Sequence, residues 1–482
     1  MIESWGRIPK VTQSSVAVQW PQDRLPETNL LMLPYGQGRS YGDSCLNDQN
    51  LLLTTGNLRR LMAFDESTGV LTCEAGCTFD QILQFSVPRG WFLPVTPGTK
   101  FVSVAGAIAN DVHGKNHHSA GNFGNHVHRF ELLRSNGERL LCSMSENRDL
   151  FRATVGGLGL TGLITWAEFG LKKIESSRIV QDSTRFQNLK EFFELSEKSE
   201  QSHEFSVAWI DCLATGAQLG RGHFLAGNWV KSDGGTGSGP GPGPGSGSGL
   251  GLGSGLGLGS GPGSGSPAAP GSGSHVIPGG PFDSRDLTVH PTKQLTIPLD
   301  FPSFALNSLS IEAFNFAYYW RQLPRFKSSA IHYDPFFYPL DKIHQWNRIY
   351  GSRGFYQYQC VVPYENGHEP ITDILRAISK AKTGSFLAVL KTFGATPPLG
   401  MLSFPRPGVT LALDFPNLGR KTLDLMDRLD EIVRSTSGGA IYPAKDARMS
   451  REMFERSFPH LDEFKKHIDP QFSSTFWRRV QK

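Results

Sequence analysis

The sequence lacks several features that would assign it to a membrane-spanning or nucleic-acid-binding class. No uninterrupted apolar run reaches the roughly 18 residues that a transmembrane helix needs. No basic segment followed by an apolar one opens the chain, so we expect no secretory signal. This favours the cytoplasm or the periphery of the cell membrane and leaves the periplasmic face open. The 48 Lys and Arg nearly balance the 44 Asp and Glu, so the chain carries no polybasic footprint for nucleic acid.

Cysteine is scarce and shows no metal-binding spacing. The chain has six cysteines in 482 residues, and only Cys73 and Cys77 lie close together, with no second pair to complete a zinc site. We therefore expect free thiols. Glycine is concentrated in residues 233–274, where it alternates with Ser, Leu and Pro without the every-third-residue repeat of collagen. This tract has too little apolar surface to fold, so we predict a disordered loop.

The rest of the chain changes in character near residue 178. Before this point, short β-like runs are bounded by Gly, and a helix is predicted over residues 79–85 because apolar residues recur at helical spacing after Thr78, a typical N-cap. After it, Gly is sparse, and helices such as residues 189–198 alternate with aromatic strands such as residues 205–211. A basic, amphipathic helix pair is predicted at the C-terminus. The pattern indicates a mixed α+β fold.

Three Gly-rich stretches in the first region combine a flexible backbone with polar side chains. They are residues 36–43 (GQGRSYGD), 97–109 (PGTKFVSVAGAIA) and 153–162 (ATVGGLGLTG). Closely spaced glycines let backbone N–H groups approach an anion such as a pyrophosphate. No long helical pattern follows the first stretch, so it is not a dinucleotide-binding fingerprint. A cluster of surface turns stays open as the alternative.

A histidine cluster follows the second stretch. Five of the 14 histidines belong to it, at positions 113, 117, 118, 126 and 128. A metal site is disfavoured, because Asp111 is the only acidic residue nearby, no thiol is in range, and Lys115 would repel a divalent cation. Structural histidines and a polar wall around an anionic cofactor or substrate both stay open.

Taken together, the order and content of these stretches resemble the FAD domain of the vanillyl-alcohol-oxidase-type flavoproteins. The run at residues 111–126 (DVHGKNHHSAGNFGNH) is more specific and resembles the decaprenylphosphoryl-β-D-ribose 2-oxidase family, the flavin half of a two-enzyme epimerase. The resemblance continues through residues 206–209 (SVAW), 354–359 (GFYQYQ), 390–394 (LKTFG), 414–416 (DFP) and 442–448 (YPAKDAR). It covers nearly the whole chain apart from the Gly/Ser/Pro tract.

The resemblance implies a two-domain FAD-binding fold. An FAD-binding domain is expected over residues 1–177, a substrate domain built on an antiparallel sheet over residues 178–437, and a C-terminal segment that returns to the FAD domain over residues 438–482. The residues expected to bind FAD are Gly36, Gly38, Arg39, Ser40, Tyr41, Gly98, Thr99, Gly106, Asn110, His113, Gly114, Ser119, Gly121, Gly157, Gly162 and Tyr442. Relatives with covalent flavin usually carry His at the position of Arg39, so noncovalent FAD is expected here.

The reaction implied is oxidation of the C2 hydroxyl of a polyprenylphosphoryl-β-D-ribose to the 2-keto sugar. This is the first half of an epimerisation to the arabinose donor for cell-wall arabinan, which a partner short-chain reductase completes. Lys445 is the first candidate for the group beside the hydroxyl, as a base if burial lowers its pKa or else as a cationic donor, and His113 is the second. The residues expected to bind substrate are Lys115, Trp209, Gln357, Gln359, Lys391, Phe393 and Thr410.

The sequence departs from the family pattern at one place, and three other functions stay open. The family typically reads Asn-x-Cys before Asp-Phe-Pro, whereas residues 410–412 read Thr-Leu-Ala, so hydride chemistry here would not need that thiol. The alternatives are an FAD-dependent aldonolactone or alditol oxidase acting on a free sugar, a noncatalytic flavin-binding scaffold, and a zinc hydrolase. A lipid-linked substrate further implies peripheral membrane contact, for which the basic C-terminal end is suited.

Overall fold

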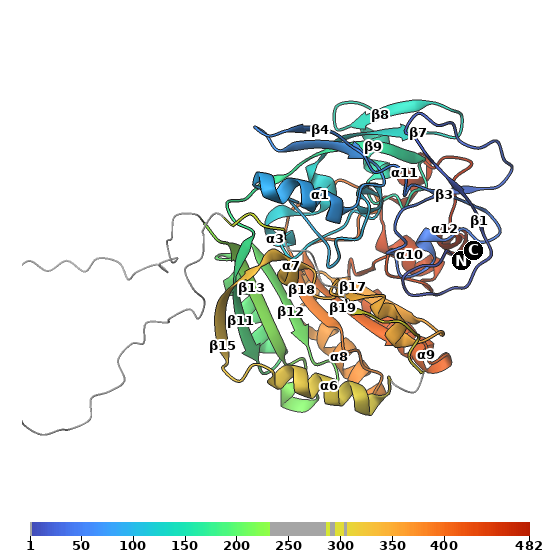
Figure 1. Ribbon diagram of the computed structural model, residues 1–482. Coiled ribbons are helices and arrows are strands. Elements are labelled where there is room, and N and C mark those ends of the chain that lie inside the picture. The colour runs from blue at the N-terminus through green and yellow to red at the C-terminus, as the bar shows by residue number, and fades with distance from the viewer. Residues whose placement is uncertain (1, 232–285, 290–294, 303–305) are drawn as a thin grey trace, which may run out of the picture.

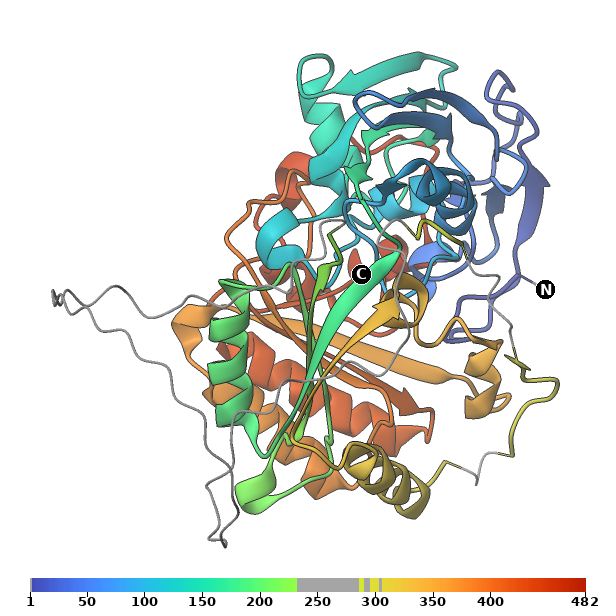
Figure 2. The same cartoon turned by 60° about the vertical axis from the view of Figure 1, so that its left-hand side comes forward.

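The computed structural model describes residues 2–231, 286–289, 295–302 and 306–482 (Figure 1). The loop predicted at residues 233–274 lies outside this part of the chain. Within the described ranges, no helix combines the length and the apolar character that crossing a bilayer requires. The chain forms two regions, which Figures 1 and 2 show one above the other, with a C-terminal segment that contacts both.

Two larger sheets, a small two-stranded sheet of β6 (Trp91–Phe92) and β10 (Lys172–Lys173), and four short helices build the first region, drawn mainly in blue and cyan in Figure 1. A parallel sheet has the strand order β1-β3-β2, and an antiparallel sheet has the order β4-β5-β9-β7-β8. The strands are β1 (Ser14–Ala17), β2 (Met32–Tyr35), β3 (Leu51–Thr54), β4 (Leu61–Asp65), β5 (Val70–Glu74), β7 (Val127–Leu133), β8 (Arg139–Ser143) and β9 (Leu163–Gly170). The helices are α1 (Phe79–Ser86), α2 (Val104–Ala109), α3 (His117–Ala120) and α4 (Arg148–Thr154).

The helix predicted after Thr78 is confirmed as α1. The Thr78 hydroxyl accepts from the Gln81 N–H, and the Gln81 side chain accepts from the Thr78 N–H, which makes a capping box. Phe79, Ile82 and Leu83 are buried on one side of the helix. The cap and the apolar spacing therefore both act locally, which is why the sequence alone predicted this helix.

The second region is an eight-stranded antiparallel sheet with the order β15-β11-β13-β12-β18-β19-β17-β20. The strands are β11 (Arg178–Phe186), β12 (Phe205–Ile210), β13 (Gly222–Trp229), β15 (Phe326–His332), β17 (Phe355–Val362), β18 (Ala388–Phe393), β19 (Gly408–Pro416) and β20 (Ala440–Ile441). Its principal helices are α5 (Leu189–Glu200), α6 (Ser308–Trp320), α8 (Glu369–Ala381) and α9 (Arg420–Ser435). Smaller elements are β14 (Leu295–Thr296), β16 (Ile343–His344) and α7 (Tyr333–Phe337).

The two faces of this sheet differ because side chains alternate along each strand. On β17, Tyr358 and Cys360 join the apolar core that packs against α5, α8 and α9, whereas Gln357 and Gln359 point to the opposite face. On β19, Leu411 belongs to the same core. We call the opposite, polar side the cavity face of the sheet. The predicted α+β fold with an antiparallel second sheet is confirmed.

The C-terminal segment returns to the first region. It forms three short helices rather than the predicted pair: α10 (Arg451–Ser457), α11 (Leu461–Lys465) and α12 (Thr475–Val480). The prediction missed the break that Pro470 makes between α11 and α12, where the chain turns and Gln471 and Ser473 form backbone hydrogen bonds with Met32. The exact domain boundaries at residues 177 and 437 stay a prediction.

Candidate active site

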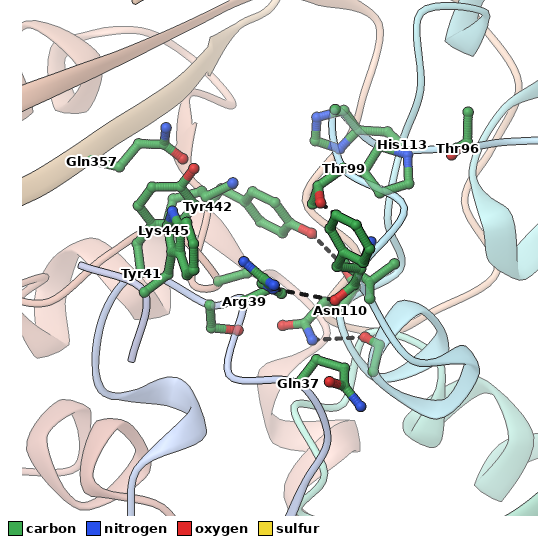
Figure 3. Close-up of a pocket in the computed structure, with 18 of the residues that line it drawn as sticks. Gln37, Arg39, Tyr41, Thr96, Thr99, Asn110, His113, Gln357, Tyr442 and Lys445 are labelled. Carbon is green, nitrogen blue, oxygen red and sulfur yellow. Dashed lines mark hydrogen bonds between the residues drawn. The ribbon is translucent and has the colours of Figure 1, made fainter. Parts of the chain in front are cut away.

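A cavity of about 410 Å³ opens between the first region and the cavity face of the large sheet. This volume is typical of a small-molecule site. Its walls include the loop after β2, the segment around α2, part of the histidine cluster, five strands of the large sheet and the turn after β20 (Figure 3). All of the residues predicted for the site line this cavity except Ser119, Gly121, Gly157 and Phe393.

The loop after β2 fixes a cation in the cavity wall. Gly38 has a φ of +60°, and a Cβ there would lie 2.0 Å from the Tyr35 hydroxyl, so only Gly fits. Next to it, the Arg39 guanidinium stacks on the Trp5 ring at 4.2 Å, and its Nε donates to the Phe101 carbonyl at 3.3 Å. Burial lowers the pKa of Arg39, but a guanidinium stays charged at neutral pH.

The wall around α2 leaves open space at one glycine. A Cβ on Gly98 would meet no atom within 4 Å, so a side chain there would project into the cavity. Beyond it, the Ser103 hydroxyl caps α2 by accepting from the Gly106 N–H at 3.3 Å. At the end of the helix, the Asn110 side chain donates to the Gly106 carbonyl at 2.8 Å, and the Asn110 carbonyl accepts from the Tyr442 hydroxyl at 2.7 Å. The last bond ties the C-terminal turn to this wall.

Only one of the five clustered histidines, His113, lines the cavity. The Nδ1 of His117 accepts a hydrogen bond from the Gly394 N–H at 3.1 Å, and its ring packs against the Phe393 ring. His118 and His126 each pair with a backbone carbonyl, at 3.0 and 2.9 Å. Three of the other members, His117, His118 and His126, are thus held by contacts within the protein, as the structural interpretation predicts.

Asp111, the acidic residue considered as a metal ligand, holds the histidine loop together. It is fully buried and accepts hydrogen bonds from the Asn122 amide at 2.7 Å, the Gly124 N–H at 3.0 Å and the Ser403 hydroxyl at 2.5 Å. Within the described ranges, no group of three or more His, Cys, Asp or Glu side chains is placed to hold a metal ion.

His113 is held as a neutral ring. Its Nε2 lies 3.0 Å from the Gln359 amide nitrogen, which also donates to the Thr410 hydroxyl at 3.2 Å. An amide nitrogen has no lone pair to offer, so Nε2 accepts and the ring proton belongs on Nδ1. Burial, and after it the positive charge of Lys391, lowers the pKa of His113 well below its usual value. His113 is thus suited to orient a neighbour as a neutral group.

Three buried lysines give the cavity its charge. Burial lowers the pKa of Lys115 to about 7, of Lys391 to about 8 and of Lys445 to about 7. Lys115 donates to the Phe336 carbonyl, and the Lys445 Nζ lies 3.9 Å from the centre of the Tyr41 ring. Figure 3 shows Lys445 and Tyr41 side by side. Near neutral pH these amines are therefore partly charged and able to exchange protons.

Asp414 is a buried carboxylate that the predicted site residues omitted. It accepts a hydrogen bond from Gln357 at 2.5 Å, and burial raises its pKa to about 7, although the charge of Lys445 acts in the opposite direction. Conversely, the Asp414 charge raises the pKa that burial of Lys445 lowers. A signal was present in the sequence, because Thr410 and Asp414 are four residues apart on one strand and so share a face.

The turn after β20 brings Lys445 to this place. The Tyr442 N–H donates to the Gln359 carbonyl at 2.9 Å, and the Lys445 N–H donates to the Tyr442 carbonyl at 3.0 Å. The Tyr41 N–H donates to the Ala444 carbonyl at 2.9 Å, which connects the turn to the loop after β2. Sheet, turn and Gly-rich loop are thus joined by backbone bonds around one side chain.

Four predicted site residues lie outside the cavity lining. Phe393 packs edge-on behind the His113 ring, with 4.8 Å between ring centres. Ser119 donates to a backbone carbonyl at 3.1 Å. At Gly121 and Gly157, a Cβ would approach neighbouring protein atoms to 2.8 and 2.0 Å, so these glycines permit close packing of the chain. These four residues therefore support the walls of the cavity from behind and do not line it.

Other cavity residues could not be found from local sequence. They include Trp5, Tyr318, Asp341 and Trp346. Trp5 and Trp346 pack edge to face with 5.7 Å between ring centres, although more than 300 positions separate them in the chain. No motif or periodicity links such distant positions, so only the tertiary fold reveals them.

Comparison with known proteins supports this site. A family model described as an FAD binding domain matches residues 23–143. The decaprenylphosphoryl-beta-D-ribose oxidase of Mycolicibacterium smegmatis is 33% identical over 491 aligned residues, which cover 99% of this chain and 96% of that protein. The chain belongs to the decaprenylphosphoryl-β-D-ribose oxidase family. As a member of this oxidase family, the protein is an FAD-dependent oxidoreductase, and the predicted family and cofactor are confirmed.

Two other relatives have a lower identity or match a smaller share of the chain. An uncharacterized protein of Streptomyces coelicolor is 29% identical over 84% of this chain and 99% of its own length. A putative D-arabinono-1,4-lactone oxidase of Neurospora crassa is 32% identical over 118 residues, which cover 24% of this chain and 21% of that protein. The match to the lactone oxidase is therefore confined to one part, whereas the match to the ribose oxidase extends through both regions.

Proposed function

We propose that this protein oxidises the C2 hydroxyl of a polyprenylphosphoryl-β-D-ribose to the 2-keto sugar, with noncovalently bound FAD. The observation that carries the proposal is Lys445. This amine is buried between the Gly-rich loop and the sheet, its pKa is lowered to about 7, and it lies in a cavity with two further lysines. The similarity to the ribose oxidase of M. smegmatis supports the choice of substrate.

Several residues that line the cavity fit FAD. Gly98 leaves room for a flat group, Arg39 supplies a cation for a pyrophosphate, and Tyr442 offers an aromatic ring in the same lining. The loop at residues 36–41 and the segment at residues 97–110 would hold the cofactor. Arg39 in place of a histidine favours a flavin that dissociates. When bound, FAD supplies the acceptor for the hydride that leaves C2.

A side chain of the protein accepts the proton of the C2 hydroxyl. As C2 loses a hydride and becomes a carbonyl carbon, its hydroxyl proton must go to a base, and the neutral form of Lys445 has a lone pair on Nζ to accept it. A pKa of about 7 keeps a large share of this amine neutral near neutral pH. Gln357 positions Asp414, whose charge tunes the pKa of Lys445, and neutral His113 orients Gln359.

The cationic and aromatic residues of the cavity suit a phosphate-linked sugar. Lys115 and Lys391 offer positive charge to a phosphodiester, which a neutral polyol would not need. Trp209 and Tyr318 pack with 4.4 Å between ring centres and present aromatic surface to a sugar or prenyl group. Thr410 and Ala412, where the family typically carries Asn and Cys, also line this part.

A comparison of substrates tests the proposal against its nearest alternative. FAD-loaded protein is mixed anaerobically with a prenylphosphoryl riboside, with free ribitol, or with an aldonolactone, while the visible flavin absorbance is followed. We expect bleaching by the riboside alone. Bleaching by the free sugars without the riboside would instead establish an alditol or aldonolactone oxidase, and no bleaching by any of them would favour a noncatalytic flavoprotein.

The proposed product has consequences for partners. A 2-keto sugar becomes the arabinose epimer only after reduction at C2 from the opposite face, so a separate short-chain reductase must consume it. The lipid-linked substrate also requires peripheral contact with a membrane. Two residues of the basic C-terminal end are engaged within the protein, because Arg479 pairs with Asp43 and Asp446, and Arg478 donates to Asn47 and to the backbone, whereas Lys466 and Lys482 are exposed.

A further inference from the structure

The helix α6 exposes an apolar stripe that the fold does not use. Leu309, Phe316 and Trp320 recur at spacings of seven and four residues, which places them along one side of the helix, and Leu323 follows three residues after the helix ends. Leu309 is 75% exposed and Leu323 is 76% exposed. We call these four residues the α6 stripe. Several large apolar side chains gathered on one exposed helix face mark an interaction surface.

The opposite side of α6 anchors the helix to the sheet. Ile311, Asn315 and Tyr319 are buried, and the Asn315 amide donates to Asp211 at 3.0 Å. The Tyr319 carbonyl lies 2.9 Å from His223 Nε2 on β13. Because the buried side already fixes the helix, the stripe contributes little to the folding of this region.

The helix α6 lies at the side of the active-site cavity that is farthest from the first region. Tyr318 lines the cavity from the side of α6 opposite the stripe, and both views place α6 along the edge of the molecule away from the first region (Figures 1 and 2). On another side, Ile343 and His344 of β16 line the cavity, and their partner strand β14 carries the exposed Leu295. The stripe therefore lies on the outer surface of a helix that contributes to the cavity wall.

Positive charge follows the stripe. Arg321 and Lys327 are exposed after α6, as is Arg325, which pairs with Glu191 at 2.6 Å, and Glu312 is the one acidic residue in the helix sequence. The Arg321 guanidinium lies over the Tyr318 ring at 3.7 Å, close to the cavity. An apolar stripe flanked by cations, with a Trp at its end, matches the chemistry of an anionic bilayer surface, where apolar side chains enter the acyl boundary and cations meet lipid phosphates.

We propose that the α6 stripe docks this protein on an anionic lipid bilayer. The inference rests on the proposed function, since a prenyl-linked sugar phosphate resides in a bilayer and docking would bring a helix of the cavity wall to the surface of that bilayer. A second copy of the chain fits this surface less well. In a two-fold interface the stripe would meet itself and would bring the cations of both copies together.

Vesicle binding tests the proposal. FAD-loaded wild type, the double variant Phe316→Ser/Leu323→Ser and the control Met62→Ser/Met144→Ser are sedimented with vesicles of equal parts phosphatidylcholine and phosphatidylglycerol, and with phosphatidylcholine vesicles alone. The control removes two exposed apolar side chains from the first region. We expect the stripe variant to bind the anionic vesicles about tenfold more weakly than wild type and control. We also expect weaker binding of wild type to the neutral vesicles.

Equal vesicle binding by all three proteins would overturn the proposal. So would a stripe variant that binds vesicles normally but loses a dimer seen for wild type, because the stripe would then be an interface between copies. Unchanged melting temperature and FAD content show that the variant is folded. Flavin reduction by a riboside with a short, water-soluble prenyl group separates the two proposals: it should be normal in the stripe variant, and its failure in wild type would contradict the proposed function but not the docking.

Discussion

At the scale of single residues, the site depends on charged groups that burial keeps close to neutrality. Lys445 and Asp414 oppose each other: burial lowers the pKa of the amine and raises that of the carboxyl, while each charge favours the charged form of the other. Lys391 acts on Lys445 in the same direction as burial. Lys445 can therefore accept a proton near neutral pH. An exposed lysine with a pKa above 10 could do so only rarely, because it is already protonated.

The pH dependence of flavin reduction should report this balance. With neutral Lys445 as the base, the rate at saturating substrate should rise with pH through a midpoint near the lowered pKa. Asp414→Asn removes the charge that raises the pKa of Lys445, so the midpoint should move to lower pH. Lys391→Met removes a charge that lowers the pKa of Lys445, so the midpoint should move to higher pH. Shifts in the same direction, or no rising limb, would argue against Lys445 as the base.

Gly98 should control whether the cofactor can enter. A Gly98→Val side chain would project into open cavity, so we expect the variant to fold with a normal melting temperature in the absence of FAD but to lose most of its bound flavin. Gly56→Val is the matched control, because a Cβ there also meets no atom within 4 Å but Gly56 does not line the cavity. Equal flavin content in both variants would place the cofactor elsewhere.

At the scale of elements, the turn after β20 depends on the C-terminal helix α12. Arg479 of α12 donates to Asp43 at 2.8 and 2.9 Å and to Asp446 at 2.9 Å, which joins the helix both to the loop after β2 and to the turn that carries Lys445. The two carboxylates are almost fully buried, whereas the Arg479 side chain is 26% exposed. Their desolvation is tolerated only because the guanidinium pairs with both.

Arg479→Met should therefore lower both stability and flavin affinity. Leaving two buried carboxylates without their cation should reduce the free energy of unfolding by about 3 kcal/mol, the lower end for such a loss because part of the guanidinium meets solvent. Chemical denaturation and FAD titration measure the two effects. Arg451→Met is the control, since its pair with Glu455 is exposed and should contribute well under 1 kcal/mol. Equal losses in both variants would contradict this role of Arg479.

The elements also show how far the sequence could predict the molecule. The α1 helix and strands such as β12 follow from local signals, a capping residue and an apolar period, and they appear within a few residues of the expected bounds. The Gly-rich loops were recognised because their backbone requirements are local as well. The Asp414–Gln357 pair depends on the register between β17 and β19, and the Arg479–Asp43 pair spans more than 400 positions. Such contacts leave no local pattern.

At the scale of the whole molecule, the cofactor is expected to lie between the first region, the C-terminal turn and the large sheet. Such a site is completed only when all three parts are folded together. A ligand that binds only this folded state stabilises it by mass action. The FAD-loaded protein should thus be more stable than the cofactor-free protein, although no covalent bond contributes.

Denaturation distinguishes noncovalent from covalent flavin. Precipitation of the yellow protein with acid should leave FAD in the supernatant and a colourless pellet. The melting temperature of the cofactor-free protein should rise with added FAD, by an amount that follows the FAD concentration. A pellet that stays yellow would show that another side chain forms the covalent bond that Arg39 cannot form.

The most direct test of the account is a single anaerobic turnover by the wild type and by Lys445→Met. Each protein is loaded with FAD and mixed with excess prenylphosphoryl riboside while the flavin absorbance is recorded. We predict rapid bleaching of the wild type and bleaching of the variant that is slower by about 10²–10⁴-fold at equal flavin content, the usual effect of losing a general base. A wild type that stays yellow, or a variant that bleaches as fast as the wild type, would contradict the account.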